Sequence, residues 1–107
     1  MINILDFTKL DIQIGTILSA EVVPEADKLL KFQIDLGDRQ VQIVSGVRPY
    51  FADPEVLVGR QVPVLVNLEP RTIKGVESQG MVLYAVGEGS LVTLGPAEKV
   101  PPGTKVK

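Results

Sequence analysis

Apolar and polar residues alternate along much of this chain, in short segments that turn residues separate. The clearest segments are residues 12–22, 32–36 and 41–44, and residues 37–39 (Gly-Asp-Arg) suit a tight hairpin between the last two. Alternation with a period of two is typical of strands, because successive side chains point to opposite faces of a sheet. Gly15 interrupts the first segment and predicts a bulge or sharp bend in a long strand. The pattern therefore predicts three strands at the start of an all-β domain.

The alternation stops between residues 45 and 60, where the sequence favours a short helix. Asp53 is a good helix cap, Pro54 suits the first helical position, and Glu55 is an acid in the first turn. Gly59 is a natural terminator. We therefore expect a helix of about one or two turns.

Two more strands follow this predicted helix. Residues 61–68 are predicted to form the fourth strand, and Pro63 indicates that the start of this strand lies at an unpaired edge. Residues 81–86 are predicted to form the fifth strand and are apolar enough to be buried on both faces. Residues 87–90 then form a turn that leads into a further β segment, residues 91–94.

Three strands, a small helix and two more strands are the order of the five-stranded oligonucleotide/oligosaccharide-binding (OB) barrel. Another small β-barrel would give similar alternation, so the pattern favours the OB barrel without excluding its competitors. A short helix over residues 5–10 and the Pro- and Gly-rich stretch at residues 100–103 would form terminal extensions. The length predicts one domain spanning residues 1–107.

The chain contains neither histidine nor cysteine. Without imidazole there is no Ser-His pair and no base that titrates unaided near neutral pH, and without thiols there is no thiolate zinc site or thiol nucleophile. The carboxylates are scattered singly, and residues 75–80 lack the Gly-Lys-Ser/Thr of a phosphate-binding loop. We expect a protein that is not an enzyme and that uses no metal and no cofactor.

The net charge of −2 does not by itself favour a nucleic-acid partner, but binding depends on local patches rather than on the sum. Residues 1–27 carry one base against five acids (−4), residues 28–74 carry seven against five (+2), and residues 75–107 carry three against three, which together give −2. All four arginines lie in the middle segment. A mildly basic middle permits nucleic-acid binding without establishing it.

Targeting signals are not evident in the sequence. No uninterrupted apolar run approaches the roughly 18 residues that a membrane span needs. Residues 1–9 lack the basic start, apolar stretch and cleavage site of a secretory signal. We expect a cytoplasmic protein with no membrane partner.

Polar residues are densest between the fourth and fifth strands, at residues 67–81. In an OB barrel this segment is one of two loops that contact nucleic acid. Arg71 and Lys74 could both face phosphates, and the other candidates could contact base edges, sugars or a base face; these are Asn67, Ser78, Gln79 and Met81. The alternative interpretation is a solvated loop with one ordinary core methionine.

A second basic cluster follows the long first strand. It contains Lys28 and Lys31, on the other binding loop of an OB barrel, where they would lie across a groove from Arg71 and Lys74. Either lysine taken alone is equally well explained as an ordinary surface residue.

These two loop segments carry a resemblance to a known family. The chain resembles the tRNA-binding domain that occurs free-standing in bacteria and at the C-terminus of methionyl-tRNA synthetase. The matching stretches follow the family order over nearly the whole chain: residues 6–11, 26–31, 35–37, 43–46, 57–60, 66–71 and 75–81.

The resemblance implies a non-catalytic, homodimeric OB barrel that recognises tRNA by shape. It implies that the groove and its Ser-x-Gly-Met-type corner bind the RNA, which selects Asn67, Arg71, Lys74, Ser78, Gln79 and Met81, with Lys28 and Lys31 opposite. The apolar residues 91–94 and Val100 are then candidates for a dimer interface, and the catalytic domain of methionyl-tRNA synthetase is a candidate partner.

Two alternatives belong to other functional classes. A sister branch of the family resembles secretion chaperones, whose dimers bind unfolded peptides, and its members carry a different corner in place of Glu-Ser-Gln-Gly-Met. A third possibility is a module that only dimerises a host synthetase.

Overall fold

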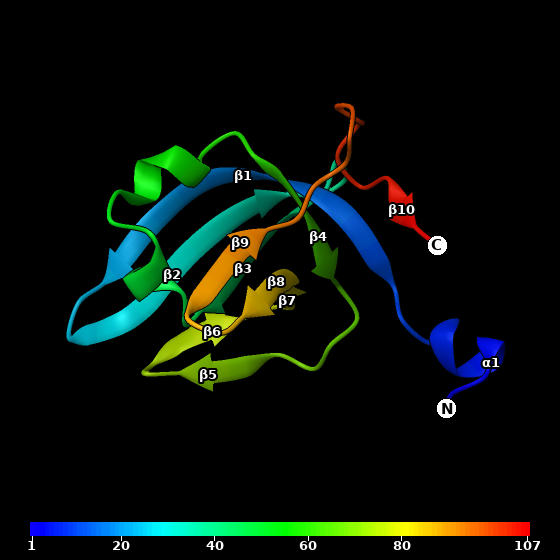
Figure 1. The fold of residues 1–107 in the computed structure, drawn as a ribbon, viewed down its shortest axis with the longest axis horizontal. Helices are drawn as coiled ribbons and strands as arrows, with labels where there is room; N and C mark the ends of the chain where they lie inside the picture. The colour runs from blue at the N-terminus through cyan, green and yellow to red at the C-terminus, as the bar shows by residue number, and fades with distance from the viewer.

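β1 (Ile12–Val23) is the longest strand and organises the fold (Figure 1). In the computed structural model, which describes residues 1–107, β1 runs antiparallel to β2 (Ala26–Asp35) on one side and to β4 (Gln61–Leu65) on the other. β3 (Gln40–Ser45) pairs with β2, and β7 (Met81–Val82) pairs with β4. The resulting strand order is β3-β2-β1-β4-β7.

Hydrogen bonds between the two ends of this order bend the sheet into a closed shape. The backbone N–H of Gln79, just before β7, donates to the carbonyl of Gln42 on β3 at 2.7 Å. The N–H of Val44 donates to the Ser78 hydroxyl at 3.0 Å. The predicted all-β fold is therefore confirmed, and its strand order is consistent with an OB-like fold.

The irregularity predicted at Gly15 lies elsewhere in β1. Gly15 keeps a regular register opposite Val62, whereas the pairing of β1 with β2 shifts between Ile17 and Ser19 and again at Val22. A Cβ at position 15 would collide with the Ile34 side chain. Gly15 is therefore required by close packing between β1 and β2, and the prediction of a bulge at that residue is wrong.

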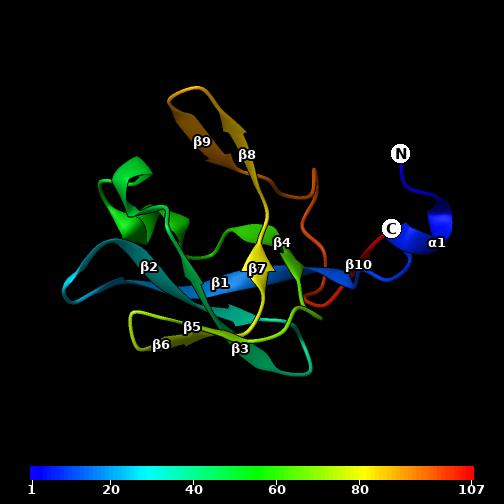
Figure 2. The same cartoon turned by 90° about the horizontal axis from the view of Figure 1, so that it is seen from below.

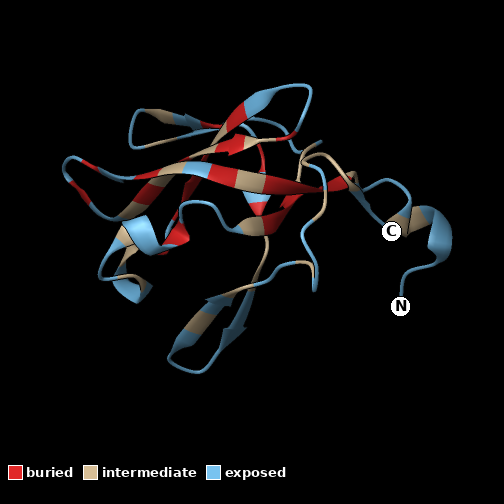
Figure 3. Cartoon of the chain, turned by 90° about the horizontal axis from the view of Figure 1, so that it is seen from above, coloured by how far each residue is buried: buried red, intermediate tan, exposed pale blue.

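Apolar residues on the inner face of the bent sheet form one core, which Figure 3 shows as buried segments along β1 and its neighbours. Phe32 and Ile34 of β2, Ile43 of β3 and Val62 of β4 are each at most 1% exposed. Leu57, which lies outside the sheet, is also fully buried. The alternation seen in the sequence therefore corresponds to the inward and outward faces of the strands.

Two short 3-10 helices, η1 (Arg48–Tyr50) and η2 (Pro54–Leu57), join β3 to β4. The Asp53 carboxylate accepts from the N–H of Glu55 at 3.1 Å, and Pro54 occupies the first turn as predicted. Gly59 follows the helix with φ of +90°. The predicted helix is confirmed in position, but it is a 3-10 helix of four residues.

The predicted fifth strand divides into two pieces. After β7, Leu83 donates its N–H to the Pro63 carbonyl at 3.1 Å, but proline has no N–H with which to return the bond. β8 (Tyr84–Gly87) then leaves the sheet and pairs with β9 (Ser90–Thr93) in a separate hairpin (Figure 2). Val86 is 70% exposed, so the expectation of burial on both faces is wrong for this segment. The expected unpaired edge does occur at the start of β4, where Gln61 and Val62 have no partner on the side that faces β7, although the Pro63 carbonyl itself accepts from Leu83.

The two chain ends meet beside the start of β1. α1 (Ile4–Phe7) has a capping box in which Asn3 accepts from the Asp6 N–H, and β10 (Lys105–Val106) pairs with Ile12 and Gln13. Figure 1 shows both termini at the same end of the molecule. None of the helices has the length and apolar character required to cross a bilayer.

Candidate nucleic-acid interface

The loop predicted to contact nucleic acid forms a small hairpin. β5 (Arg71–Ile73) pairs with β6 (Val76–Ser78) through a two-residue turn. Lys74 and Gly75 form this turn with φ of +52° and +80°, the two positive values typical of a type I′ turn. The hairpin presents Arg71 and Lys74 to solvent, with Lys74 at its tip.

The tip of this hairpin lies beside the turn that joins β1 to β2, as Figures 1 and 2 both show. A groove of about 430 Å³ separates the two segments. Lys28 and Lys74 both line it, with Leu29 and Ile73 as apolar neighbours. The structure thus brings together two basic segments that are more than 40 residues apart in the sequence, as the OB-barrel interpretation anticipated.

The two lysines of this groove, and Arg71 on the same hairpin as Lys74, are not neutralised by ion pairs. The three ion pairs of the chain use Lys9, Lys31 and Lys105. Lys28, Arg71 and Lys74 therefore have no carboxylate oxygen within 4.0 Å, although Glu25 and Asp27 also line the groove. These three cations are free to bind an anion.

Lys28 and Lys31 were expected on a loop, but both lie on β2, which already begins at Ala26. Lys31 is opposite Glu21 of β1, and its ammonium is 3.6 Å from the Glu21 carboxylate. Its side chain is 33% exposed, and it does not line the groove. Its charge is therefore partly satisfied within the sheet.

The Ser78 hydroxyl is used inside the protein. The residue is 4% exposed, and its Oγ accepts from the Val44 N–H at 3.0 Å and donates to the Gly80 carbonyl at 3.1 Å. The bond from Val44 holds β6 against β3 at the closure of the sheet, and the bond to Gly80 fixes the turn that follows β6. In this arrangement the hydroxyl supports the loop and does not face solvent.

Gln79 pairs with Gln42 of β3 as a neighbouring strand residue would, where the two ends of the sheet meet. Its N–H donates to the Gln42 carbonyl at 2.7 Å, and its side-chain carbonyl accepts from the Gln42 N–H at 2.8 Å. The Gln42 amide in turn donates to the Glu77 carbonyl at 2.8 Å and accepts from Gln33 at 3.1 Å. The side-chain amide nitrogen of Gln79 forms no hydrogen bond within the chain, so it remains available at an exposed position.

Gln33 and Gln42 were not singled out in the sequence. Both occupy polar positions of alternating strands, and they are direct cross-strand partners in the register of β2 and β3. Two glutamines that a hairpin places opposite each other are a signal that could have identified this support for the loop.

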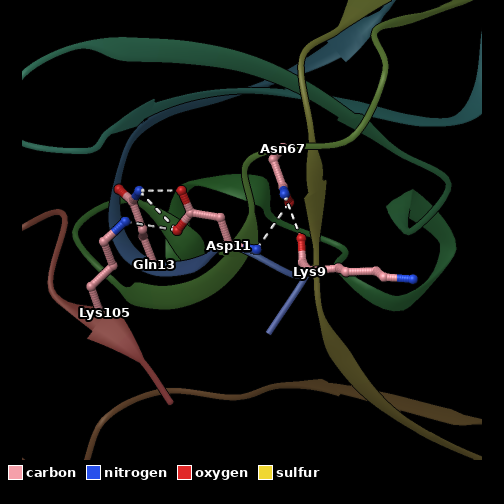
Figure 4. A network of polar contacts seen from close by, with 5 residues as sticks. All are labelled: Lys9, Asp11, Gln13, Asn67 and Lys105. Carbon is pink, nitrogen blue, oxygen red and sulfur yellow. Dashed lines mark hydrogen bonds and ion pairs between the residues drawn. The ribbon is translucent and has the colours of Figure 1, made fainter. Parts of the chain in front are cut away.

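Asn67 connects the end of β4 to the N-terminal segment (Figure 4). Its side-chain oxygen accepts from the Asp11 N–H at 3.0 Å, and its side-chain nitrogen donates to the Lys9 carbonyl at 2.8 Å. The Asp11 carboxylate pairs with Lys105 at 2.8 Å and accepts from Gln13 at 3.2 Å. The hydrogen bond from Lys105 is the main reason why the pKa of Asp11 is lowered. Asn67 therefore anchors the chain ends rather than lining the groove.

Met81 remains exposed on β7, where it pairs with Leu65. Its 42% exposure offers apolar surface to a partner. Gly80, which precedes it, has φ of +140°, and a Cβ there would lie 2.7 Å from the Leu65 carbonyl oxygen. Glycine is therefore required for the chain to turn into β7 so close to β4.

Comparison with known proteins assigns most of the chain to one family. The sequence model of the family described as "Putative tRNA binding domain" matches residues 12–105. The methionine–tRNA ligase of Porphyromonas gingivalis is 53% identical over 103 residues, which are 95% of this chain and 15% of that protein. The methionine–tRNA ligase of Archaeoglobus fulgidus is 51% identical over 105 residues, which are 98% of this chain and 16% of that protein. The chain thus spans only a small part of these curated relatives.

Solved structures share the fold over the full chain. The MetRS related protein from Pyrococcus horikoshii has a TM-score of 0.94 and 32% identity, covering 100% of this chain and 98% of that one. The chaperone CsaA from Bacillus anthracis has a TM-score of 0.89 and 34% identity, covering 100% and 99%. Solved structures of both descriptions thus share this fold and about a third of the sequence, and the family model matches residues 12–105 of this chain. The chain belongs to the putative tRNA binding domain family.

Proposed function

We propose that this domain binds tRNA without catalysing a reaction, through the groove between the β1–β2 turn and the β5–β6 hairpin. The observation that carries the proposal is the pair Lys28 and Lys74, which face one groove from two distant segments and have no ion-pair partner. Arg71 adds a third free cation on the same hairpin. The three cations outnumber Glu25 and Asp27, the two acids that line the groove, and none of the three is in an ion pair, so they can contact phosphates although the chain carries a net charge of −2.

The groove lysines and the exposed residues of the segment from β5 to β7 have chemistry that suits RNA. Lys28 and Lys74 act as mobile point charges for phosphates, and Arg71 offers a planar fork that can bind two phosphate oxygens. The free amide nitrogen of Gln79 can donate to a base edge or a sugar, and Met81 presents apolar surface to a base. The chain has three phenylalanines, two tyrosines and no tryptophan, which favours recognition of a folded shape over serial base stacking.

Ser78 and Asn67 have a supporting role in this proposal. Ser78 fixes the base of the β5–β6 hairpin, and Asn67 fixes the end of β4 that leads into it. Both residues set where Arg71 and Lys74 lie without touching the RNA. Lys31, which is held by Glu21, contributes to the electrostatic field rather than to a direct contact.

Self-association belongs to the same proposal. Val86 and Val92 of the β8–β9 hairpin are 70% and 57% exposed. Burying these residues against a second copy would remove apolar surface from water and place two grooves in one particle. We propose a homodimer that acts in the cytoplasm during protein biosynthesis, either free-standing or appended to a methionyl-tRNA synthetase.

The test is tRNA binding measured by fluorescence anisotropy at several salt concentrations, with single-stranded DNA and an unfolded peptide as competitors. We expect the double substitution R71Q/K74Q to weaken binding and to make the slope of log K against log salt about 2 less negative, because each lost phosphate contact changes it by about 1.

The matched control is R39Q/K107Q, which removes the same charge elsewhere. Arg39 lies at the β2–β3 turn, at the other end of β2 from the groove. An equal loss of affinity in both double variants would reject the groove as the binding site. Binding of the unfolded peptide by a protein that ignores tRNA would instead favour the peptide-holding function, and a dimer that binds neither ligand would favour a purely dimerising module.

A further inference from the structure

A second basic groove lies on a different part of the molecule. It has a volume of about 460 Å³ and runs between the start of β4 and the segment that follows β9. Its polar lining includes Arg60, Gln61, Thr93 and Lys99, and it contains no acidic residue. In Figure 1 this region lies at the upper edge of the molecule, away from the tip of the β5–β6 hairpin.

One hydrogen bond, to Thr93, orients the Arg60 side chain. Its Nη1 donates to the Thr93 hydroxyl at 3.1 Å. Its backbone is also fixed, because its N–H donates to the Leu57 carbonyl at 3.1 Å and its carbonyl accepts from the Ile17 N–H at 2.9 Å. A guanidinium has five N–H groups, so most of them remain free to bind a ligand after the Thr93 bond is made.

The segment after β9 forms the opposite wall of the groove, and the Gln61 side chain attaches this segment to β4. The Gln61 amide donates to the Val100 carbonyl at 2.6 Å, and its carbonyl accepts from the Val100 N–H at 3.0 Å. The same amide donates to the Thr16 hydroxyl at 3.2 Å. A Cβ at Gly95 would lie 2.7 Å from the backbone carbonyl oxygen of Gln61, so the segment that follows β9 is packed closely against β4. The groove is therefore built before any ligand arrives.

Neither cation of this groove is neutralised. Arg60 and Lys99 take part in none of the ion pairs of the chain. Glu98 is the sequence neighbour of Lys99, but its carboxylate is not within 4.0 Å of either cation. A fixed guanidinium, an ammonium and a hydroxyl around a polar groove without a carboxylate are complementary to a phosphate group.

We propose that the groove formed by Arg60, Thr93 and Lys99 binds a phosphate group, and that in the RNA complex this is a backbone phosphate. The assignment to RNA rests on the tRNA-binding function proposed above, whereas the phosphate site itself does not. The RNA path would then extend from the groove of Lys28 and Lys74 to a second contact at the start of β4. Arg60 would supply the oriented contact and Lys99 the mobile one.

The first experiment titrates inorganic phosphate into the protein and follows the backbone and Arg60 side-chain signals by NMR, with R60Q/K99Q as the comparison. We expect saturable shifts at residues 59–61 and 93–99 that the variant abolishes. Chloride at equal ionic strength controls for a general salt effect. Absence of phosphate-specific shifts in a folded wild-type protein, together with unchanged tRNA binding by the variant, overturns the proposal.

The second experiment distinguishes the source of the phosphate. We expect R60Q/K99Q to weaken tRNA binding roughly threefold to tenfold and to make the salt slope about 1 to 2 less negative, as expected for one or two exposed phosphate contacts. R39Q/K107Q is again the charge-matched control. Phosphate-specific shifts with unchanged tRNA affinity would retain a site for free phosphate and reject the RNA assignment.

A conservative variant tests the role of Thr93. Thr93→Val keeps both charges and removes the hydroxyl that holds the guanidinium. We expect weaker phosphate binding without the full loss seen in R60Q/K99Q. If the wild-type protein binds no tRNA at all, the function proposed above fails, and the phosphate titration still decides whether this groove is an anion site.

Discussion

Ser78→Ala separates a supporting role from a direct RNA contact. Ser78 is 4% exposed, and its hydroxyl accepts from the Val44 N–H and donates to the Gly80 carbonyl. Alanine would leave the Val44 N–H unpaired inside the protein, since Val44 is itself buried. An unpaired buried donor costs about 1–3 kcal/mol, and loss of the bond to Gly80 adds about 0.5–1 kcal/mol. The two terms sum to about 1.5–4 kcal/mol, and we expect the free energy of unfolding to fall by an amount near the middle of that range, about 2–3 kcal/mol.

The assay is urea unfolding at one fixed protein concentration, because self-association would make stability depend on concentration. We expect the midpoint to fall by about 1–2 M urea while the slope of free energy against urea stays the same. Ser90→Ala is the matched control: Ser90 is exposed in the β8–β9 hairpin, and its hydroxyl forms no hydrogen bond within the chain. This control should change stability by no more than about 0.5 kcal/mol.

The tRNA affinity of the Ser78 variant is then measured where it is fully folded. We expect it to stay within about threefold of wild type, because the hydroxyl bonds to Val44 and Gly80 and is not presented to solvent. A variant as stable as Ser90→Ala that binds tRNA more than about tenfold more weakly would refute the reasoning. The hydroxyl would then act on the RNA, and the closure of the sheet would not depend on it.

Three further predictions concern the frame around the groove. Gly80→Ala should lower the free energy of unfolding by at least about 2 kcal/mol, because φ is +140° and the new Cβ would meet the Leu65 carbonyl. The control Gly46→Ala, with open space around the new Cβ, should lower it by less than about 1 kcal/mol, and equal stabilities of the two variants would contradict this reasoning. Lys105 lowers the pKa of Asp11, so the Asp11 carboxylate stabilises the fold at pH values above the ordinary pKa of the group, and this stabilisation is lost as the pH falls through the lowered pKa. Urea unfolding from pH 5 to pH 2.5 should show this loss of stability in the wild type and a flatter pH profile in Asp11→Asn. Burial raises the pKa of Tyr84 to about 12, so the free energy of unfolding should decrease as the pH rises above 10, the ordinary pKa of a tyrosine. In a Tyr50→Phe variant, where Tyr84 is the remaining tyrosine, the 295 nm absorbance should rise only near pH 12, and a rise near pH 10 in the folded protein would contradict the burial of Tyr84.

The sequence predicted the parts of the fold that local chemistry determines. Alternation identified β1, β2 and β3, and Asp53 and Pro54 located the helix before β4, because period-two patterning and helix capping are properties of neighbouring residues. The division of the predicted fifth strand was missed. It depends on Pro63, a residue nearly 20 positions earlier in the chain, which cannot continue the ladder beyond Leu83.

The candidate site was predicted less completely than the fold, for a physical reason. A hydroxyl or amide that bonds to the protein backbone uses the same donors and acceptors as one that bonds to RNA, so Asn67 and Ser78 look alike in either role. The salt bridge of Lys31 depends on the cross-strand position of Glu21, which the register of β1 and β2 decides. Lys28, Arg71 and Lys74 carry charge that the fold leaves free, and they remain the strongest candidates.

The number of phosphates that the protein contacts follows from its free cations and can be counted by salt dependence. The slope of log K against log salt is about −0.7 to −0.9 per phosphate contacted. The three cations at the first groove and its hairpin, Lys28, Arg71 and Lys74, predict a slope of about −2 to −3, and the addition of Arg60 and Lys99 predicts about −4. Engagement of the first groove on both subunits of a homodimer also predicts about −4 to −5, so the wild-type slope alone does not separate one subunit with two grooves from two subunits with one. R60Q/K99Q separates them: in the first case its slope returns to about −2 to −3, and in the second it does not change. A wild-type slope near zero would contradict both, because binding that releases no counterions cannot depend on these cations.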